Sequence, residues 1–203
     1  MIINGIVHTI YITKLDFNTL GGNPMSILEK VSSETRGIFN MFFDKEPLNY
    51  LEAAGLYGVI AQGRYNVSAL EVIYNHAQDS ELKALIKEAI VKQTTNLIEH
   101  SEKLLSESGG TLPTLSFTKR TLHKNPLDIP ADARMTDGEI AIAVGTMAKA
   151  AQMALLATLH QSYQLEVALM YREMLDAGLD WDYRLLQLML DRGWLPRLAK
   201  IEH

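Results

Sequence analysis

The sequence predicts an all-α protein that folds as a four-helix bundle with one long crossover between its second and third helices. Two long stretches with helical periodicity precede Gly109, and two more follow Met135. The segment between them has no helical pattern and contains three of the six prolines of the chain. A connection of this length is unusual in a bundle, because most helices are joined by short loops.

One long crossover is typical of ferritin-like bundles, so this is the architecture we expect. A chain of 203 residues is long enough for one domain with a sizeable core. The net charge of -5 is spread along the chain without a basic stripe, which argues against nucleic-acid binding. The absence of cysteine excludes disulfides, thiolate nucleophiles and cysteine-ligated metal sites.

Four segments are predicted: an arm of residues 1–24, a short amphipathic helix or linker of residues 25–45, the bundle of residues 46–195 and a tail of residues 196–203. The arm lacks a basic stretch followed by an apolar run, so no signal peptide is expected, and the protein is expected in the cytoplasm unless it is associated with another structure. The short helix would pack on the bundle or on a partner chain.

The arm has two alternative interpretations. The codons of Gly21 and Gly22 can contain a purine-rich GGAGG stretch, at a ribosome-binding distance before the ATG codon of Met25. Residues 1–24 are therefore either a translated leader or an ordinary N-terminal arm.

Helix one is expected from about Glu46 to His76, with Asp44 as its cap. Helix two is expected to begin after the cap Asp79 and to end at Gly109. Apolar spacing predicts the inward-facing residues of both helices: Leu48, Gly55, Val59, Gln62, Asn66, Leu70 and Ile73, then Leu82, Ile86, Ala89, Gln93, Leu97, His100 and Leu104.

Helix three is expected to open with a capping box formed by Thr136 and Glu139, and to end near His160. Its apolar stretch is about as long as a membrane span, but Lys149 and Gln152 near its middle favour a buried helix and no span. Helix four is expected from near Ser162 to Asp191, with Gly193 after its end, and these inward-facing residues: Ala168, Tyr171, Leu175, Leu179, Leu186 and Met189.

A di-iron or di-manganese site is not predicted. Such a site needs a carboxylate from each of two helices and Glu-x-x-His from each of the other two, and no glutamate here has a histidine three residues later. We therefore expect no catalytic residue, metal ligand or cofactor. The expected feature is a polar layer in the core, made of Gln62, Asn66, Gln93, His100 and Tyr171, whose hydrogen bonds fix the helix register. The alternatives are a small-molecule site or a weak metal site there.

Several cap and turn sequences resemble a family of uncharacterised helical proteins of endospore-forming bacteria, often labelled as spore coat proteins of the coat-F-like type. They are Glu46-Pro47-Leu48-Asn49-Tyr50, Tyr74-Asn75-His76-Ala77, Asp79 with Glu81-Leu82-Lys83, Leu112-Pro113, Ile129-Pro130 with Ala133-Arg134 and Thr136-Asp137, and Arg192-Gly193-Trp194-Leu195. The resemblance implies a ferritin-like bundle, a protein in the cytoplasm or associated with the spore, and no catalytic residues.

The expected function is that of a non-enzymatic structural or interaction protein, a spore-coat-like bundle that associates with itself or with other coat-type proteins. Two alternatives stay open. One is a ferritin-like metal-binding or oxidoreductase protein with a degenerate site that uses Glu52, Gln62 and His100. The other is a bundle whose polar core binds a small ligand.

Overall fold

The computed structural model describes residues 47–199 and residue 201, which belong to the second of the two units, residues 46–203, into which the chain divides. The predictions for residues 1–24 and 25–45 lie outside the described residues. The elements are α3 (Tyr50–His76), α4 (Ser80–Glu88), a π-helical segment η1 (Ala89–Thr94), α5 (Thr95–Glu107), α6 (Asp137–His160) and α7 (Leu165–Asp191). No strand occurs in the described part of the chain.

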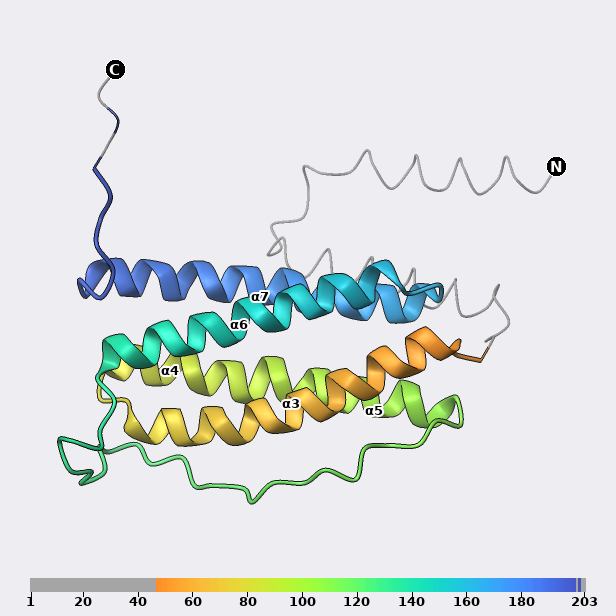
Figure 1. Cartoon of the computed structure of the whole chain (residues 1–203), viewed down its shortest axis with the longest axis horizontal. Helices are drawn as coiled ribbons and strands as arrows, with labels where there is room; N and C mark the ends of the chain where they lie inside the picture. Colours follow the sequence, from red (N-terminus) through yellow and green to blue (C-terminus); the bar gives the residue numbers. More distant parts are fainter. Residues whose placement is uncertain (1–46, 200, 202–203) are drawn as a thin grey trace, which may run out of the picture. The chain divides into compact units, whose positions relative to one another are not determined.

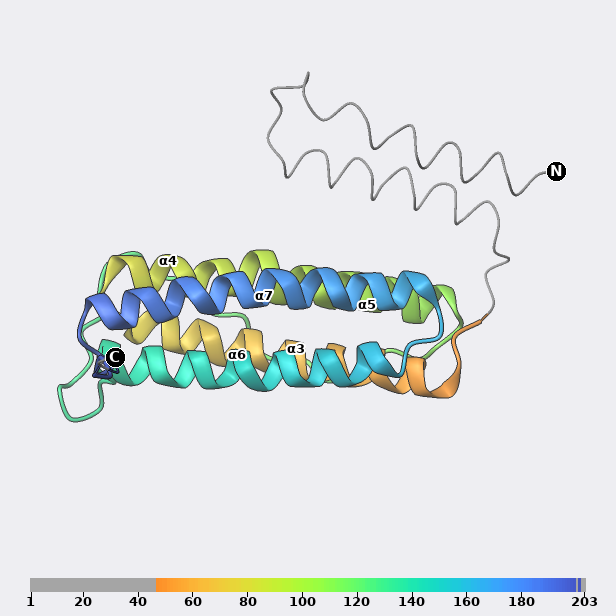
Figure 2. The same cartoon turned by 90° about the horizontal axis from the view of Figure 1, so that it is seen from above.

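The four rods of the bundle are α3, the continuous α4–η1–α5 rod, α6 and α7 (Figure 1). The second rod runs antiparallel to α3, and the crossover then returns along the bundle, so that α6 runs parallel to the second rod (Figures 1 and 2). This arrangement confirms the predicted all-α, ferritin-like four-helix bundle and its long crossover between helices two and three.

The helix starts follow from side chains that satisfy free backbone amides. The cap of α3 is Asn49, which accepts hydrogen bonds from the amides of Leu51 and Glu52, so helix one begins later than the predicted Glu46. The caps Asp79 and Thr136 are those predicted, and Thr136 forms the predicted capping box with Glu139.

Two glycines end rods of the bundle in the left-handed backbone region. Gly109 has φ of 76° after α5, and Gly193 has φ of 69° after α7. In each case the next residue donates to a carbonyl of the last turn, Gly110 N to Leu105 O at 2.9 Å and Trp194 N to Met189 O at 2.9 Å. These bonds satisfy carbonyls that a helix end leaves free.

The second rod does not keep one helical phase. Its buried residues before η1 are Leu82, Lys83 and Ile86, of which Leu82 and Ile86 were predicted, but after η1 they are Ile98, Ser101 and Leu105. Each of the last three follows directly after a predicted core residue (Leu97, His100, Leu104). A π-helical turn inserts one residue into an α-helix, so every later position moves around the axis by one residue.

The crossover is bound along the outer side of α3. The Arg64 guanidinium donates to the carbonyls of Pro113 and Leu115 at 2.6 and 2.8 Å.

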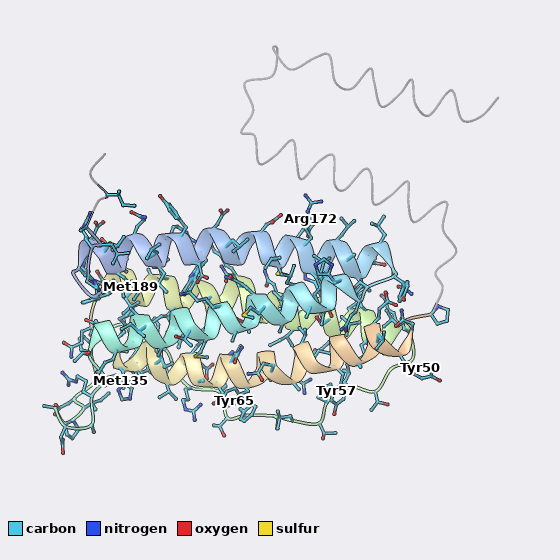
Figure 3. All side chains as sticks on the ribbon, turned by 45° about the horizontal axis from the view of Figure 1, so that its top comes forward. Tyr50, Tyr57, Tyr65, Met135, Arg172 and Met189 are labelled. Atoms are coloured by element: carbon cyan, nitrogen blue, oxygen red, sulfur yellow. The ribbon has the colours of Figure 1, made fainter. Side chains whose placement is uncertain are left out.

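A second set of contacts holds the crossover farther along α3. The Arg120 amide donates to the Glu71 carboxylate at 2.8 Å. Asn75 exchanges two 2.9 Å hydrogen bonds with the backbone of Thr121 and His123, and Tyr65 packs edge-on against Phe117 (Figure 3).

The predicted buried helix is only partly buried. Of the described helices, α6 alone is long and apolar enough to cross a membrane by length and composition, a test that core helices also pass. Only 28% of its most apolar window is buried within the protein. Leu179 and Leu186 of α7, which were predicted to face inward, are also exposed. The reason is that one side of the α6–α7 pair has no covering element among the described residues.

Candidate functional site

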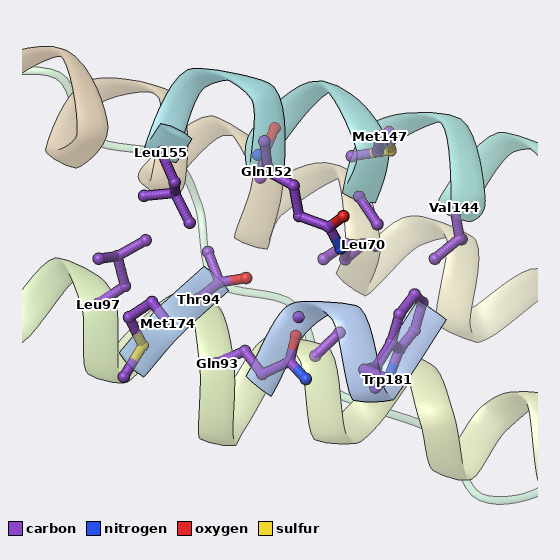
Figure 4. A pocket seen from close by; sticks show the side chains of 15 residues that line it. Leu70, Gln93, Thr94, Leu97, Val144, Met147, Gln152, Leu155, Met174 and Trp181 are labelled. Carbon is purple, nitrogen blue, oxygen red and sulfur yellow. The ribbon is translucent and has the colours of Figure 1, made fainter. Parts of the chain in front are cut away.

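A small cavity lies in the middle of the bundle, where all four rods meet. Its volume is about 90 Å³, and it is walled mainly by apolar side chains with a few amides and one hydroxyl (Figure 4). The lining residues come from α3 (Asn66, Leu70), from η1 and α5 (Ala89, Gln93, Thr94, Leu97), from α6 (Val144, Met147, Ala148, Ala151, Gln152, Leu155) and from α7 (Met174, Gly178, Trp181).

The π-helical segment forms one wall of this cavity. Three of its residues, Ala89, Gln93 and Thr94, line the space, and the Thr95 hydroxyl donates to the Ile90 carbonyl at 2.7 Å. On the facing rod, the indole N–H of the buried Trp181 donates to the Leu85 carbonyl at 2.9 Å. Each of these carbonyls also accepts from a backbone amide, Leu85 from Ala89 and Ile90 from Thr95, so the side chains add a second hydrogen bond next to the widened turn.

The side-chain amides that line the cavity do not hydrogen-bond to one another, and each has a partner of its own. Gln93 Nε2 donates to the Ala177 carbonyl at 3.4 Å, and Gln152 Nε2 donates to Asp182 Oδ2 at 3.0 Å. Asn66 Oδ1 accepts from Gln62 Nε2 at 2.9 Å. Of the predicted layer, therefore, Asn66 and Gln93 line the same cavity, but no hydrogen bond joins them directly. Gln152 also lines the cavity, although it was not part of the predicted layer.

Two members of the predicted polar layer lie outside the core. Gln62 and His100 are exposed, so the prediction that they face inward is wrong. His100 Nδ1 lies 2.9 Å from the carbonyl of Asn96, within its own helix. The π-helical turn explains the exposure of His100, because it turns Ser101 toward the core instead. On α3, Gly63 is buried in place of its neighbour Gln62. Ile98 packs so closely on Gly63 that a Cβ at this position would lie 2.7 Å from the Ile98 side chain.

Tyr171 is buried as predicted, but in a different part of the core. It belongs to an apolar cluster with Leu56, Ile60 and Val167, not to the cavity wall. Its hydroxyl has no hydrogen-bond partner within the described structure. Burial raises the pKa of Tyr171 to about 12, and the negative charge of Glu52 acts in the same direction. The adjacent Thr158 hydroxyl lowers this pKa and offsets part of the rise.

Glu52 is a buried carboxylate with a structural task. One oxygen accepts from the Asn49 amide at 3.1 Å, which completes the capping box of α3. The other oxygen accepts from the amides of Tyr163 and Gln164 at 2.8 and 2.6 Å, in the turn between α6 and α7. A carboxylate at helix starts is also favoured by the helix dipoles.

The residues present do not fit a ferritin-type metal centre. Throughout the described residues, no group of three His, Asp or Glu side chains lies close enough to hold a metal ion. Glu52 is occupied by three backbone amides, and Gln62 and His100 are exposed. The degenerate site considered from the sequence is therefore not assembled by these three residues.

A wider apolar groove lies between α6 and α7 on their outer side. Its volume is about 270 Å³, and Ile142, Tyr183 and Leu186 in its wall are 50%, 64% and 42% exposed. The charged residues of the wall are Lys149 and Asp182. Partial burial raises the pKa of Asp182, against the lowering effects of the Gln152 hydrogen bond and the Lys149 charge.

The chain is similar to several bacterial proteins. The uncharacterized protein YvdQ of Bacillus subtilis is 29% identical over 150 residues, which cover 74% of this chain and 86% of YvdQ. A crystal structure from Bacillus halodurans, described as a "putative spore coat protein", superposes with a TM-score of 0.70 at 26% identity, covering 78% of this chain and 98% of that chain.

A more distant neighbour shows the fold alone. A two-domain protein of Anabaena variabilis with a ferritin-like domain has a TM-score of 0.56 at 18% identity, over 75% of this chain and 41% of that one. Its ferritin-like domain agrees with the bundle described above. A family model matches residues 36–201, which is most of the chain and includes the entire bundle. The chain therefore belongs to the family described as "Protein of unknown function (DUF3231)".

Proposed function

We propose that the protein is a non-enzymatic structural or interaction protein, associated with the spore in the manner of a coat component. The observation that carries this proposal is the exposed apolar side of α6 and α7. Soluble proteins rarely expose contiguous apolar surface without using it to bind another molecule. The similarity to the Bacillus halodurans protein supports the spore as the place of action.

The polar groups of the core support the same proposal. Glu52 holds two helix starts together, and Trp181 and Thr95 donate hydrogen bonds to carbonyls of the second rod. Groups that are committed to structural hydrogen bonds are poorly placed to act as a general acid, a general base or a metal ligand.

The proposal is tested by locating the protein during sporulation and by measuring its metal content. We expect an antibody to detect the native protein in the coat fraction of purified spores, and not in vegetative cells. Elemental analysis of protein purified without chelator should give far less than one iron or manganese per chain. Stoichiometric metal, or expression confined to vegetative growth, would contradict the proposal.

The core cavity favours a second candidate function, the binding of a small uncharged molecule. Its wall is mostly apolar, with Gln93, Thr94 and Gln152 as polar groups, which is the usual composition of a ligand site. A thermal-shift screen with small alcohols and amides tests it, with Gln93→Leu as the variant that should lose the shift. Uniformly unchanged melting temperatures would count against this candidate.

A further inference from the structure

We propose that the partner of the α6–α7 groove is a second copy of the same chain, packed groove to groove about a two-fold axis parallel to the helices. This inference rests on the proposed interaction function and deepens it by naming the partner. In this arrangement α6 of each copy lies over α7 of the other, and each copy uses the same surface, as a symmetric dimer requires.

The apolar surface extends well beyond the groove itself. On α6, Met153 and Leu156 are 73% and 44% exposed, and on α7, Leu179 is 52% exposed. With Ile142, Tyr183 and Leu186 they make six large apolar side chains on two adjacent, antiparallel helices. Exposed alanines at positions 150, 154 and 157 leave room for another helix to approach α6 closely.

The surface is large enough for a stable dimer. At a rise of about 1.5 Å per residue, the 24 residues of α6 and the 27 residues of α7 are each about 36–40 Å long. Two helices side by side present a width of about 18 Å, so the face has an area on the order of 700 Å². Stable protein interfaces bury roughly 800 Å² of accessible surface per partner, which is the same scale.

The charges of the groove select one arrangement of two copies. Lys149 and Asp182 lie at the same height on facing walls, because Gln152, one turn after Lys149, bonds to Asp182 and the Lys149 charge acts on that carboxylate. Rotation about an axis parallel to the helices places Lys149 against Asp182 of the partner subunit, and the reciprocal contact forms at the same time. An axis across the helices at the height of this pair would place each Lys149 against the partner's Lys149, which is repulsive.

The test uses charge reversal in the full chain, with molecular mass measured by analytical ultracentrifugation. We expect the unchanged protein to sediment as a dimer of two 22.7 kDa chains. Lys149→Asp and Asp182→Lys each create two like-charge contacts, so each variant alone should dimerise at least about 100-fold more weakly. An equimolar mixture of the two variants should dimerise again, because both contacts in the mixed dimer are then attractive.

The mixture distinguishes a contact between chains from one within a chain. If the two groups matter only inside one chain, mixing the variants restores nothing, and the proposal is overturned. A full chain that stays monomeric at micromolar concentration also overturns it. Lys103→Asp on α5, which is likewise exposed, is the matched control and should leave the dimer intact.

Circular dichroism confirms that each variant is folded before its mass is interpreted. If Asp182→Lys does not fold, Tyr183→Lys places a charge at an exposed position of the same wall and should also weaken the dimer about 100-fold. If the unchanged protein is monomeric but is present in the spore coat fraction, only the proposed interface is refuted. If it is a dimer but is absent from the spore, only the proposed location is refuted.

Discussion

Glu52 connects the start of α3 to the turn between α6 and α7 through hydrogen bonds to three backbone amides. We predict that Glu52→Gln lowers the free energy of unfolding by about 1–3 kcal/mol, because one oxygen and the negative charge are lost while the amides stay buried. Urea denaturation measures the change. Glu99→Gln on the exposed side of α5 is the control and should change stability by less than about 0.5 kcal/mol.

Tyr171 presents the opposite situation, a buried hydroxyl without a hydrogen-bond partner in the described structure. Removing a polar group that is desolvated and unpaired is neutral or stabilising. We therefore predict that Tyr171→Phe leaves the free energy of unfolding unchanged or raises it by up to about 1 kcal/mol. A loss of more than 1 kcal/mol in the same urea assay would mean that the hydroxyl has a partner in solution.

The π-helical segment η1 is the element that decides which residues of the second rod are buried. Deleting Lys92, an exposed residue inside η1, should convert the rod to continuous α-helix and keep Ile98, Ser101 and Leu105 in the core. We predict a melting temperature within about 5 °C of the unchanged protein. Deleting Glu99 instead shifts the phase of every residue after it and should lower the melting temperature by at least about 10 °C, because two buried positions, Ser101 and Leu105, are lost.

Differential scanning calorimetry on the two deletions measures this difference. Both remove one exposed charged residue from the same rod, so the comparison isolates the position of the deletion. Equal melting temperatures would show that the extra residue of η1 does not set the phase.

Glu88 and Arg184 join α4 to α7 by two hydrogen bonds of 2.6 and 3.0 Å. The Arg184 hydrogen bond, against partial burial, holds the pKa of Glu88 below its ordinary value of 4.5. The stabilisation by this carboxylate is therefore complete above pH 4.5 and is lost as the pH falls through the lower pKa of the folded state.

We predict that Glu88→Gln is less stable than the unchanged protein at pH 7, by up to about 1 kcal/mol for a partly exposed pair. The two proteins should converge in stability as the pH falls well below 4.5. Melting temperatures from pH 3 to pH 7 measure this, and parallel curves would contradict the assignment. Glu99→Gln, which removes an exposed charge from α5 of the same rod, is the control for the loss of a negative charge.

The ends of the elements could be predicted from the sequence because local chemistry determines them. Asp79 and Thr136 cap helices, and Gly109 and Gly193 end them, without help from distant residues. The inward face of the second rod could not be predicted in full, because the extra residue of η1 moves every later position around the helix axis. No 3.6-residue pattern carries that information.

The candidate site was predicted only in part for the same reason. Asn66 and Gln93 were expected inside and do line the cavity, whereas Gln62 and His100 are exposed. Leu179 and Leu186 were assigned to the core because they are apolar, and a sequence alone does not distinguish a core face from a binding face. Their exposure is the information that the structure adds.

At the scale of the whole molecule, α3 holds the crossover against the bundle through Arg64, Glu71 and Asn75. We predict that Arg64→Met lets trypsin cut the exposed crossover at Lys119, Arg120 or Lys124 at least about tenfold faster, because two bonds to its backbone are lost. Gel electrophoresis of a digestion time course measures the rate. Lys103→Met, which touches no crossover residue, should leave the rate unchanged.

The crossover joins two helical hairpins, α3 with the second rod and α6 with α7, whose contacts with each other do not depend on the covalent link. A chain interrupted near Asn125 would still bring the same apolar surfaces and the same Glu52 hydrogen bonds together. Two polypeptides made from separate genes, each containing one hairpin, would then assemble into one domain. Recombination at this segment could exchange one hairpin for that of a relative and leave the other unaltered.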